Sequence, residues 1–225
     1  MGTLLIASQS LSPFRDRHEA GALLGDRLLA SADDAAVVLG IPRGGMIVAQ
    51  EIAQILGADL DISLTLKLTA PDIPELAIGA LSEDGWLFLD PGLSRRTGVD
   101  ELYLEQERQH QMSVMSRQVR QYRKIRPKIP LEGRTVVITD DGAASAASLL
   151  ASIWALRRER PARLIAAVPV GSVEAVTGLS DDADYVLALK VPPVLDSVGR
   201  FYVLFDEPTD EEVMDVLKIG GQGLA

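Results

Sequence analysis

Short apolar runs of strand-forming residues alternate along this chain with segments of helical periodicity. The runs lie at 36–41, 61–68, 135–139, 164–170 and 185–189, and helical spacing is found at 46–56 and 148–158. Such alternation is typical of βαβ units, whose parallel sheet is covered by helices on both faces. We therefore expect an α/β fold built on a doubly wound, mainly parallel sheet.

One segment interrupts this alternation. Two apolar runs, 76–81 and 86–89, flank Glu83-Asp84-Gly85, and an Asp-Gly pair is a strong signal for a hairpin turn. An amphipathic stripe follows, and its members recur every three or four residues: Val99, Leu102, Gln106, Gln109, Met112, Met115, Val119 and Tyr122. We expect a single domain of residues 1–225 with an inserted hairpin and long helix at about 82–130.

The inserted segment also differs from the rest of the chain in charge. Residues 95–134 contain 10 Lys and Arg against 5 Asp and Glu, although the whole chain has a net charge of −10. The basic residues gather towards the carboxyl end of the expected helix, where the helix dipole favours cations: Arg117, Arg120, Arg123, Lys124 and Arg126. Two interpretations stay open, a solvated basic face or a cationic surface that faces an anionic ligand or a second subunit.

Composition excludes several functional classes. Cysteine is absent, which removes disulfides, zinc–thiolate sites and cysteine nucleophiles. The excess of acids, 32 against 22 Lys and Arg, argues against a general nucleic-acid partner. No apolar stretch approaches the roughly 20 residues of a membrane span, and residues 1–12 lack the basic start of a secretory signal. We expect a cytoplasmic protein without a membrane partner.

A first candidate binding stretch is Pro42-Arg43-Gly44-Gly45, which joins an expected strand to an expected helix. Backbone N–H groups at a helix N-terminus bind anions, and glycines let an anion approach the main chain. Arg43 adds charged donors. The alternative is that the Gly-Gly pair serves only to reverse the chain.

A second candidate stretch begins with Asp140 and Asp141, which directly follow the apolar run 135–139. Ligands of open α/β sheets bind outside the carboxyl ends of the strands, so the two carboxylates are suited to a sugar diol or a metal-bound ligand. The next residues are small and lead into a helix, where backbone N–H groups with Ser145 and Ser148 suit a phosphate. The alternative is an Asp helix cap with small residues for close packing.

This second stretch resembles the ribose-phosphate-binding signature of class I phosphoribosyltransferases, an apolar strand, two acids and a loop of small residues. The chain as a whole is similar to bacterial phosphoribosyltransferases of about this length. The similar positions, in order, are 14–17, 20–21, 42–45, 67, 74–80, 126–127, 140–142, 168–170, 198–199, 201–202 and 210–213. The resemblance spans nearly the full chain and is more specific than either loop alone.

The resemblance implies a transferase that uses 5-phosphoribosyl-1-pyrophosphate and a nucleobase-like acceptor, requires Mg²⁺ and releases pyrophosphate. It implies that Asp140 and Asp141 bind the ribose hydroxyls and hold Mg²⁺, directly or through water, and that Lys67 is a catalytic cation. The 5-phosphate would be held by the loop that follows the acids: Gly142, Ala143, Ala144, Ser145, Ala146, Ala147 and Ser148.

The resemblance also gives the first stretch a role, since Arg43, Gly44 and Gly45 would line the pyrophosphate site. A homodimer is expected because the apolar seam of the 95–126 helix needs a partner. Trp154 and Tyr202 are expected to be core residues rather than base-stacking residues.

The chain departs from the family pattern in the second candidate stretch and after the second strand. Ala143 replaces a branched apolar residue, Ser145 a Thr and Ala146 a Gly, while Leu66 and Thr69 stand where the family has Arg and Gly. If residue 146 required a positive φ, Ala would cost about 1 kcal/mol there. Because Leu66 stands where the family has Arg, one cation that the family pattern gives to the pyrophosphate site is missing.

Two other functions stay open. One is a catalytically weak nucleotide-binding or phosphosugar-binding regulatory protein on the same fold. The other is an RNA or acidic-protein interface on the basic helix, which rests on the local charge alone.

Overall fold

The computed structural model describes residues 2–8, 11–31, 36–71 and 73–220. Its main sheet has six parallel strands in the order β1-β9-β8-β7-β2-β3. The strands are β1 (Thr3–Ser8), β2 (Val37–Gly40), β3 (Asp59–Ile62), β7 (Thr135–Thr139), β8 (Arg163–Val170) and β9 (Tyr185–Lys190). The helices around it are α1 (Arg17–Leu28), α2 (Gly44–Leu56), α5 (Ala147–Arg157), α6 (Val173–Asp182), η1 (Val198–Phe201) and α7 (Asp210–Ile219).

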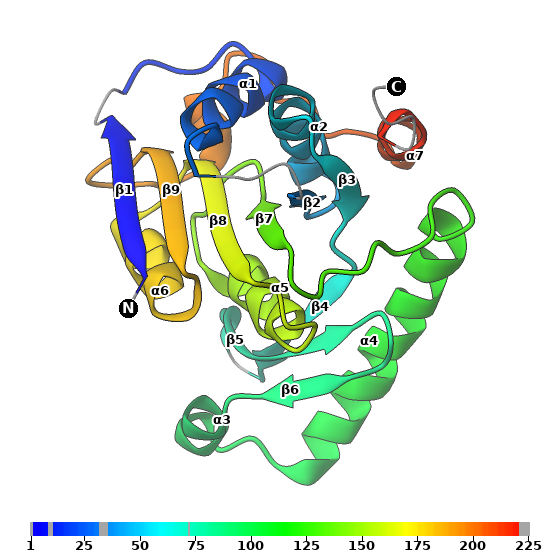
Figure 1. Ribbon diagram of the computed structural model, residues 1–225. Coiled ribbons are helices and arrows are strands. Elements are labelled where there is room, and N and C mark those ends of the chain that lie inside the picture. The colour runs from blue at the N-terminus through cyan, green and yellow to red at the C-terminus, as the bar shows by residue number, and fades with distance from the viewer. Residues whose placement is uncertain (1, 9–10, 32–35, 72, 221–225) are drawn as a thin grey trace.

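The alternating direction of side chains along the central strand β7 explains why helices cover both faces of the main sheet. Val137 packs in the core shared with α1, α2 and α7, whereas Val136 and Ile138 pack in the core shared with α5 and α6. Successive side chains of a strand point to opposite faces. In Figure 1, α1 and α2 lie on one side of the sheet and α5 and α6 on the other. The expected doubly wound α/β fold is confirmed.

The chain between β3 and β7 forms a second unit. An antiparallel sheet is made of β4 (Thr65–Ala70), β5 (Ile73–Ser82) and β6 (Leu87–Leu89), in that order, and α3 (Pro91–Thr97) and α4 (Glu101–Tyr122) follow. Figure 1 shows this sheet beyond α5, with α4 running along it. The expected hairpin is present, and Gly85 at its turn has φ of 79°, which favours glycine.

Two expectations about individual elements are wrong. The apolar run 61–68 is not one strand, because the chain leaves the main sheet after Ile62 and enters the second sheet at Thr65. The stripe on α4 is broken too, since Leu102 is 67% exposed and only Met115 and Tyr122 among the described residues of α4 are buried. A run of apolar residues does not encode where the chain changes sheets.

No helix among the described residues is long and apolar enough to cross a membrane.

Candidate functional site

The two acids of the second stretch lie where β7 ends, at the carboxyl edge of the parallel sheet. The backbone N–H of Asp141 donates to Oδ1 of Asp140 over 2.9 Å. The side chain of Asp141 is 18% exposed. β7 has neighbours on both sides, β8 and β2, so the acid pair sits centrally in the molecule rather than on a sheet edge strand. This is the position expected from the sequence.

Burial and mutual repulsion shift the acid pair towards protonation. Burial, followed by the charge of Asp141, raises the pKa of Asp140 well above its usual value. Burial also raises the pKa of Asp141, although the ion pair with Arg17 opposes that shift. A ligand that brings positive charge or hydrogen-bond donors would relieve this repulsion.

Arg17 is the cation that partly balances the acids; it lies within the similar positions 14–17, but the resemblance assigned it no role. Its Nε and Nη2 atoms each lie 2.8 Å from Oδ2 of Asp141, and its side chain is 8% exposed. Nη1 donates to the backbone oxygen of Asp206 over 2.8 Å. One guanidinium therefore ties the acid pair to the carboxyl-terminal segment.

Local structure explains why Arg17 reaches the acids. Arg17 is the first residue of α1, and Asp16 caps that helix by accepting from the backbone N–H of Glu19. The guanidinium of Arg17 lies over the ring of Phe205, 3.9 Å from its centroid. A cation stacked on an aromatic face with its N–H groups paired is held in one orientation.

Tyr202 closes the same side of the site. Its hydroxyl donates to the backbone oxygen of Asp141 over 2.6 Å, and its ring stacks on Phe205 with centroids 4.9 Å apart. Burial raises its pKa well above the usual value, so the hydroxyl keeps its proton. Tyr202 is 6% exposed and therefore buried, as expected, but it is also a positioning residue for the acid pair.

The Arg43-Gly44-Gly45 turn packs directly against the acids because β2 and β7 are neighbours in the sheet. A Cβ at Gly44 would lie 2.0 Å from Oδ2 of Asp141, and one at Gly45 would lie 2.8 Å from Cα of Asp140. Both glycines are needed for this close approach. The two candidate stretches, nearly 100 residues apart in the chain, form one site.

Arg43 lies at the mouth of this turn. Its side chain is 39% exposed and makes an ion pair with Glu207, whose side chain is 72% exposed. The Pro42–Arg43 peptide bond is cis. An exposed ion pair of this kind is weak and can exchange for a ligand anion.

The loop of small residues splits into a buried and an exposed part. Ala143 is buried and forms a parallel bridge with Gly171, and a Cβ at Gly142 would lie 2.5 Å from Val198. Ala144 and Ser145 are exposed. The loop therefore combines close packing, which was the alternative interpretation, with an accessible tip.

Ala146 does not require a positive φ. Its φ is −78° and it precedes α5, with no side-chain hydrogen bond capping the helix. The conformational free-energy cost that a positive φ would impose on Ala146 is therefore absent. An open pocket of about 490 Å³ lies beside the loop, and Ser145 and Ser172 line it together with Glu174.

Lys67 is placed on a different sheet from the acids. It lies on β4, partly buried, opposite Ala80 of β5. Its assigned role stays a prediction.

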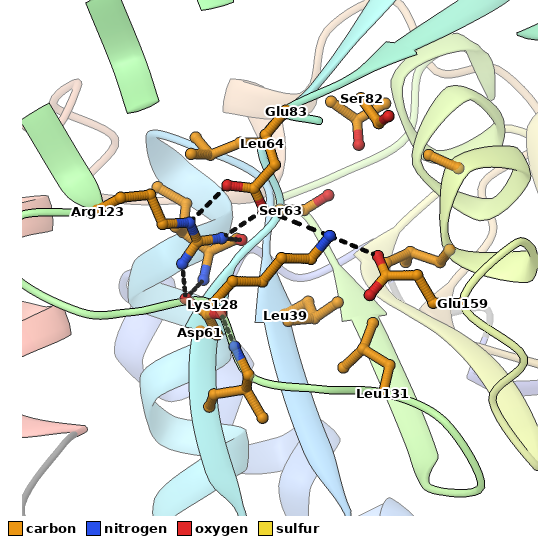
Figure 2. Close-up of a pocket in the computed structure, with 15 residues that line it drawn as sticks. Leu39, Asp61, Ser63, Leu64, Ser82, Glu83, Arg123, Lys128, Leu131 and Glu159 are labelled. Carbon is orange, nitrogen blue, oxygen red and sulfur yellow. Dashed lines mark hydrogen bonds and ion pairs between the residues drawn. The ribbon is translucent and has the colours of Figure 1, made fainter. Parts of the chain in front are cut away.

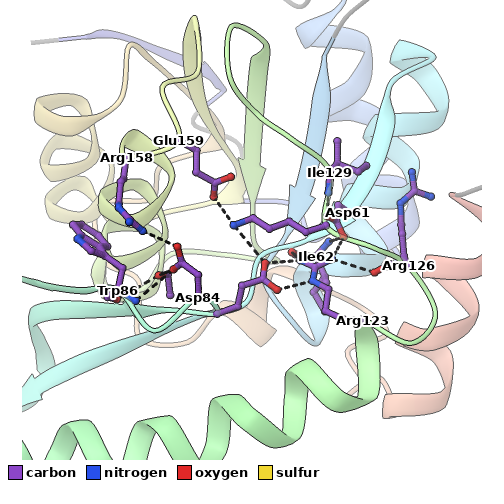
Figure 3. Close-up of polar contacts among 12 residues, drawn as sticks. Asp61, Ile62, Asp84, Trp86, Arg123, Arg126, Ile129, Arg158 and Glu159 are labelled. Atoms are coloured by element: carbon purple, nitrogen blue, oxygen red, sulfur yellow. Dashed lines mark hydrogen bonds and ion pairs between the residues drawn. The ribbon is translucent and has the colours of Figure 1, made fainter.

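The basic end of α4 is mostly a structural clamp rather than a free cationic surface. Arg123 Nε and Nη2 donate to the two oxygens of Glu83 over 2.6 and 2.8 Å, and Nη1 donates to Asp61 over 2.7 Å. The backbone N–H of Ile129 donates to the other oxygen of Asp61 over 3.1 Å. Figures 2 and 3 show this cluster, with Lys128 reaching Glu159. We call it the Arg123 cluster.

The Arg123 cluster is closed to ligands. The cavity that it borders holds about 20 Å³, which is room for roughly one water molecule. The Arg123 and Arg126 side chains are each 13% exposed, so the solvated-face interpretation is wrong for them. It holds for Arg117, Arg120 and Lys124, which are exposed.

The fold and the site together define a type I phosphoribosyltransferase-like protein. A doubly wound parallel sheet carries an acid pair on its central strand, a small-residue loop into the next helix and a glycine turn on the adjacent strand. No protein-family model matches the chain.

Two Mycobacterium tuberculosis proteins, each named "putative phosphoribosyl transferase", are 38% identical to the chain over 204 residues. The match covers 91% of this chain and 46% of each relative, so the chain spans about half the length of these curated relatives. The chain is therefore similar to these phosphoribosyltransferase-named proteins over nearly its whole length.

Solved structures agree with this fold. TT1426 from Thermus thermophilus is 45% identical, with a TM-score of 0.86, covering 92% of this chain and 98% of its own. The AQ2163 protein from Aquifex aeolicus shares the fold at 11% identity, with a TM-score of 0.50, covering 84% of this chain and 86% of its own.

Proposed function

We propose that the protein transfers a phosphoribosyl group from 5-phosphoribosyl-1-pyrophosphate to a nucleobase-like acceptor, with Mg²⁺, in the cytoplasm. The bond between the anomeric carbon and pyrophosphate breaks, and pyrophosphate leaves with the bonding electrons. A bond from an acceptor nitrogen to the same carbon forms, and that nitrogen loses its proton. The observation that carries the proposal is the acid pair with a single partial counter-charge, packed against Gly44 and Gly45.

The acid pair suits the ribose ring. A ribose diol presents two adjacent hydroxyl donors, and Asp140 and Asp141 are adjacent acceptors whose repulsion those donors relieve. Carboxylates beside the anomeric carbon also stabilise the positive character that develops when pyrophosphate departs. Arg17 and Tyr202 hold Asp141 in place.

The loop after the acids suits the 5-phosphate. Ser145 is exposed beside the uncapped amino end of α5, where backbone N–H groups lack a side-chain acceptor. The N-terminus of a helix is a favourable place for an anion. Glu174 at the rim of this pocket would limit how much negative charge the pocket accepts.

The glycine turn suits pyrophosphate. The absence of Cβ atoms lets the phosphates approach the backbone at Gly44 and Gly45, and Arg43 would exchange its ion pair with Glu207 for the leaving group. Such donors stabilise charge that develops in the transition state. We keep Lys67 as a second cation for this step.

The donor set fits Mg²⁺. No group of three or more metal-ligating side chains occurs among the described residues, but Mg²⁺ usually takes one or two carboxylates and completes its shell with water and substrate phosphates. Asp140 and Asp141 would supply those carboxylates, and the ion would neutralise charge on the departing pyrophosphate.

The test is release of pyrophosphate from the donor with Mg²⁺ and a panel of purine and pyrimidine bases, measured with a coupled phosphate assay. We expect turnover by the natural chain. Gly44→Ala should reduce donor affinity by about tenfold or more, because the new methyl group collides with Asp141 and Arg17. Gly178→Ala is the matched control, since a Cβ there meets nothing within 4 Å.

Each outcome separates the candidate functions. Donor or nucleotide binding by calorimetry without any turnover would favour the regulatory binding protein. Absence of both binding and turnover, or equal activity of Gly44→Ala and Gly178→Ala, would overturn the assigned site.

The homodimer stays a prediction. The exposed Leu102 and Met112 on α4 are the apolar side chains that such an interface would cover. Light scattering on the purified chain measures the mass directly.

A further inference from the structure

Both tryptophans of the chain line one open pocket that lies apart from the acid pair. The pocket has a volume of about 500 Å³, within the range of small-molecule sites. Its apolar wall consists of Trp86, Phe88 and Trp154, and its polar lining includes Asp90, Asp182 and Arg158. Aromatic residues make up only 4% of the chain, so three of them on one pocket is a marked concentration.

The aromatic wall is continuous. The rings of Trp86 and Phe88 are stacked, with centroids 5.8 Å apart at 29°, and those of Phe88 and Trp154 are 4.9 Å apart at 47°. β6 and its turn carry the first two rings and α5 carries the third. All three side chains are only partly buried. Trp154 is therefore not a core residue, contrary to the expectation from the sequence.

Two carboxylates in the pocket keep hydrogen-bonding capacity. Asp182 Oδ1 accepts from Nε1 of Trp154 over 3.3 Å, and Asp90 Oδ1 accepts from the first N–H groups of α3. Within the part of the chain that the structure describes, Oδ2 of each has no hydrogen-bond partner. Both oxygens are available to N–H donors of a ligand.

The rim of the pocket is cationic. Arg158 lies beside the ring of Trp86, 5.5 Å from its centroid, and pairs with Asp84 over 2.6 Å, as Figure 3 shows. Half of its side chain is exposed. Arg157 is held by Asp184 through two hydrogen bonds.

We propose that this pocket binds a guanine nucleoside or nucleotide. Aromatic side chains stack on the faces of nucleobases. Guanine presents two adjacent N–H donors that match one carboxylate, whereas adenine presents a single exocyclic donor beside an acceptor. Asp182 offers such a carboxylate, because among the described residues its Oδ2 is free and its Oδ1 accepts a single hydrogen bond from Trp154, so it selects guanine. Arg158 lies where a phosphate would add affinity. The proposal is independent of the proposed catalytic function.

Intrinsic fluorescence tests the proposal because both tryptophans are reporters. The wild-type chain is titrated with guanosine, guanosine 5′-monophosphate and adenosine, with free N-acetyltryptophanamide as the correction for absorbance. We expect saturable quenching by guanosine, slightly tighter binding of the monophosphate, and at least about tenfold weaker binding of adenosine. Asp182→Asn should weaken the binding of guanosine by about tenfold and leave the binding of adenosine unchanged.

Two further variants separate this pocket from the acid pair. The double variant Asp140→Asn/Asp141→Asn should bind guanosine as the natural chain does, and Phe88→Leu should lose binding while a thermal melt shows that it folds. The proposal is overturned if quenching does not saturate, if guanosine and adenosine quench alike, or if the Asp140→Asn/Asp141→Asn variant loses the signal.

Discussion

The acid pair at the end of β7 and the Arg123 cluster both bury two carboxylates, but they balance the charge differently. In the Arg123 cluster, Asp61 is 1% exposed, and Arg123 and the backbone N–H of Ile129 each donate to it. In the acid pair, one guanidinium contacts Asp141, and the pKa values of both carboxyl groups are raised.

This difference in charge balance indicates that the Arg123 cluster has a structural role and that the acid pair is suited to bind a ligand. A buried carboxylate with its full set of donors makes the fold depend on its partner, because removal of that partner leaves an uncompensated buried charge. A buried carboxylate with a raised pKa costs stability at neutral pH, and such sites cluster where proteins bind ligands or catalyse reactions. The three predictions below test this contrast.

The largest effect is expected from breaking the Arg123 cluster. Arg123→Met would leave Asp61 and Glu83 buried without their main donor, and removing one partner of a buried ion pair costs about 3–5 kcal/mol of unfolding free energy. Urea denaturation measures the loss. Lys218→Met, which removes an exposed ion pair with Asp215, should change stability by less than about 0.5 kcal/mol. Equal effects of the two variants would contradict the contrast.

In the acid pair, a substitution is expected to raise the unfolding free energy instead of lowering it. Asp140→Asn should raise the unfolding free energy at pH 7 by about 1 kcal/mol, because an amide there has no charge to bury. The folded-state pKa of Asp140 is raised above the 3.8 of a free aspartate, so the folded chain holds a proton that the unfolded chain has already released. Stability of the natural chain therefore falls as pH rises between those two pKa values.

This pH dependence determines how Asp140→Asn should be tested. The gain over the natural chain should be greatest above the folded-state pKa and should vanish as pH falls towards 3.8. Thermal melts across this range would show it, alongside loss of turnover. A variant that is less stable than the natural chain at pH 7 would mean that the charge of Asp140 is already balanced.

The smallest effect is expected in the loop after the acid pair. Ala146→Gly restores the residue of the family pattern, but Ala146 already has φ of −78°. We expect less than about 0.5 kcal/mol change in stability and no gain in donor affinity. A tenfold improvement in affinity or turnover would show that the backbone at residue 146 changes conformation when the ligand binds.

The parts of the site that could be predicted are those encoded by neighbouring residues. Asp140, Asp141 and the Gly44-Gly45 turn each follow a short apolar strand, and parallel strands bring such ends to one edge of the sheet. Arg17 could not be predicted in this way, because it begins α1 instead of directly following a strand, and its partner Asp141 lies 124 residues away in sequence. The basic end of α4 was ambiguous for the same reason, since the acids that pair with Arg123 lie far away in the chain.

The departures of the fold from expectation have a physical cause as well. Residues 61–68 are uniformly strand-forming, and only the tertiary structure places 59–62 in the main sheet and 65–70 in the second. On α4, apolar spacing alone does not show how much of the helix surface the small second sheet covers, so Leu102 stays exposed.

The strand order has a consequence for how the chain acquires its structure. β1 pairs only with β9 among the strands described, and Thr3 lies opposite Tyr185. β1 therefore cannot join the sheet until β9, which begins at Tyr185, has been synthesised. Contacts between such distant residues slow folding, and an unpaired strand edge invites association with other chains. Production of this protein should thus be sensitive to conditions that hold nascent chains apart until synthesis is complete.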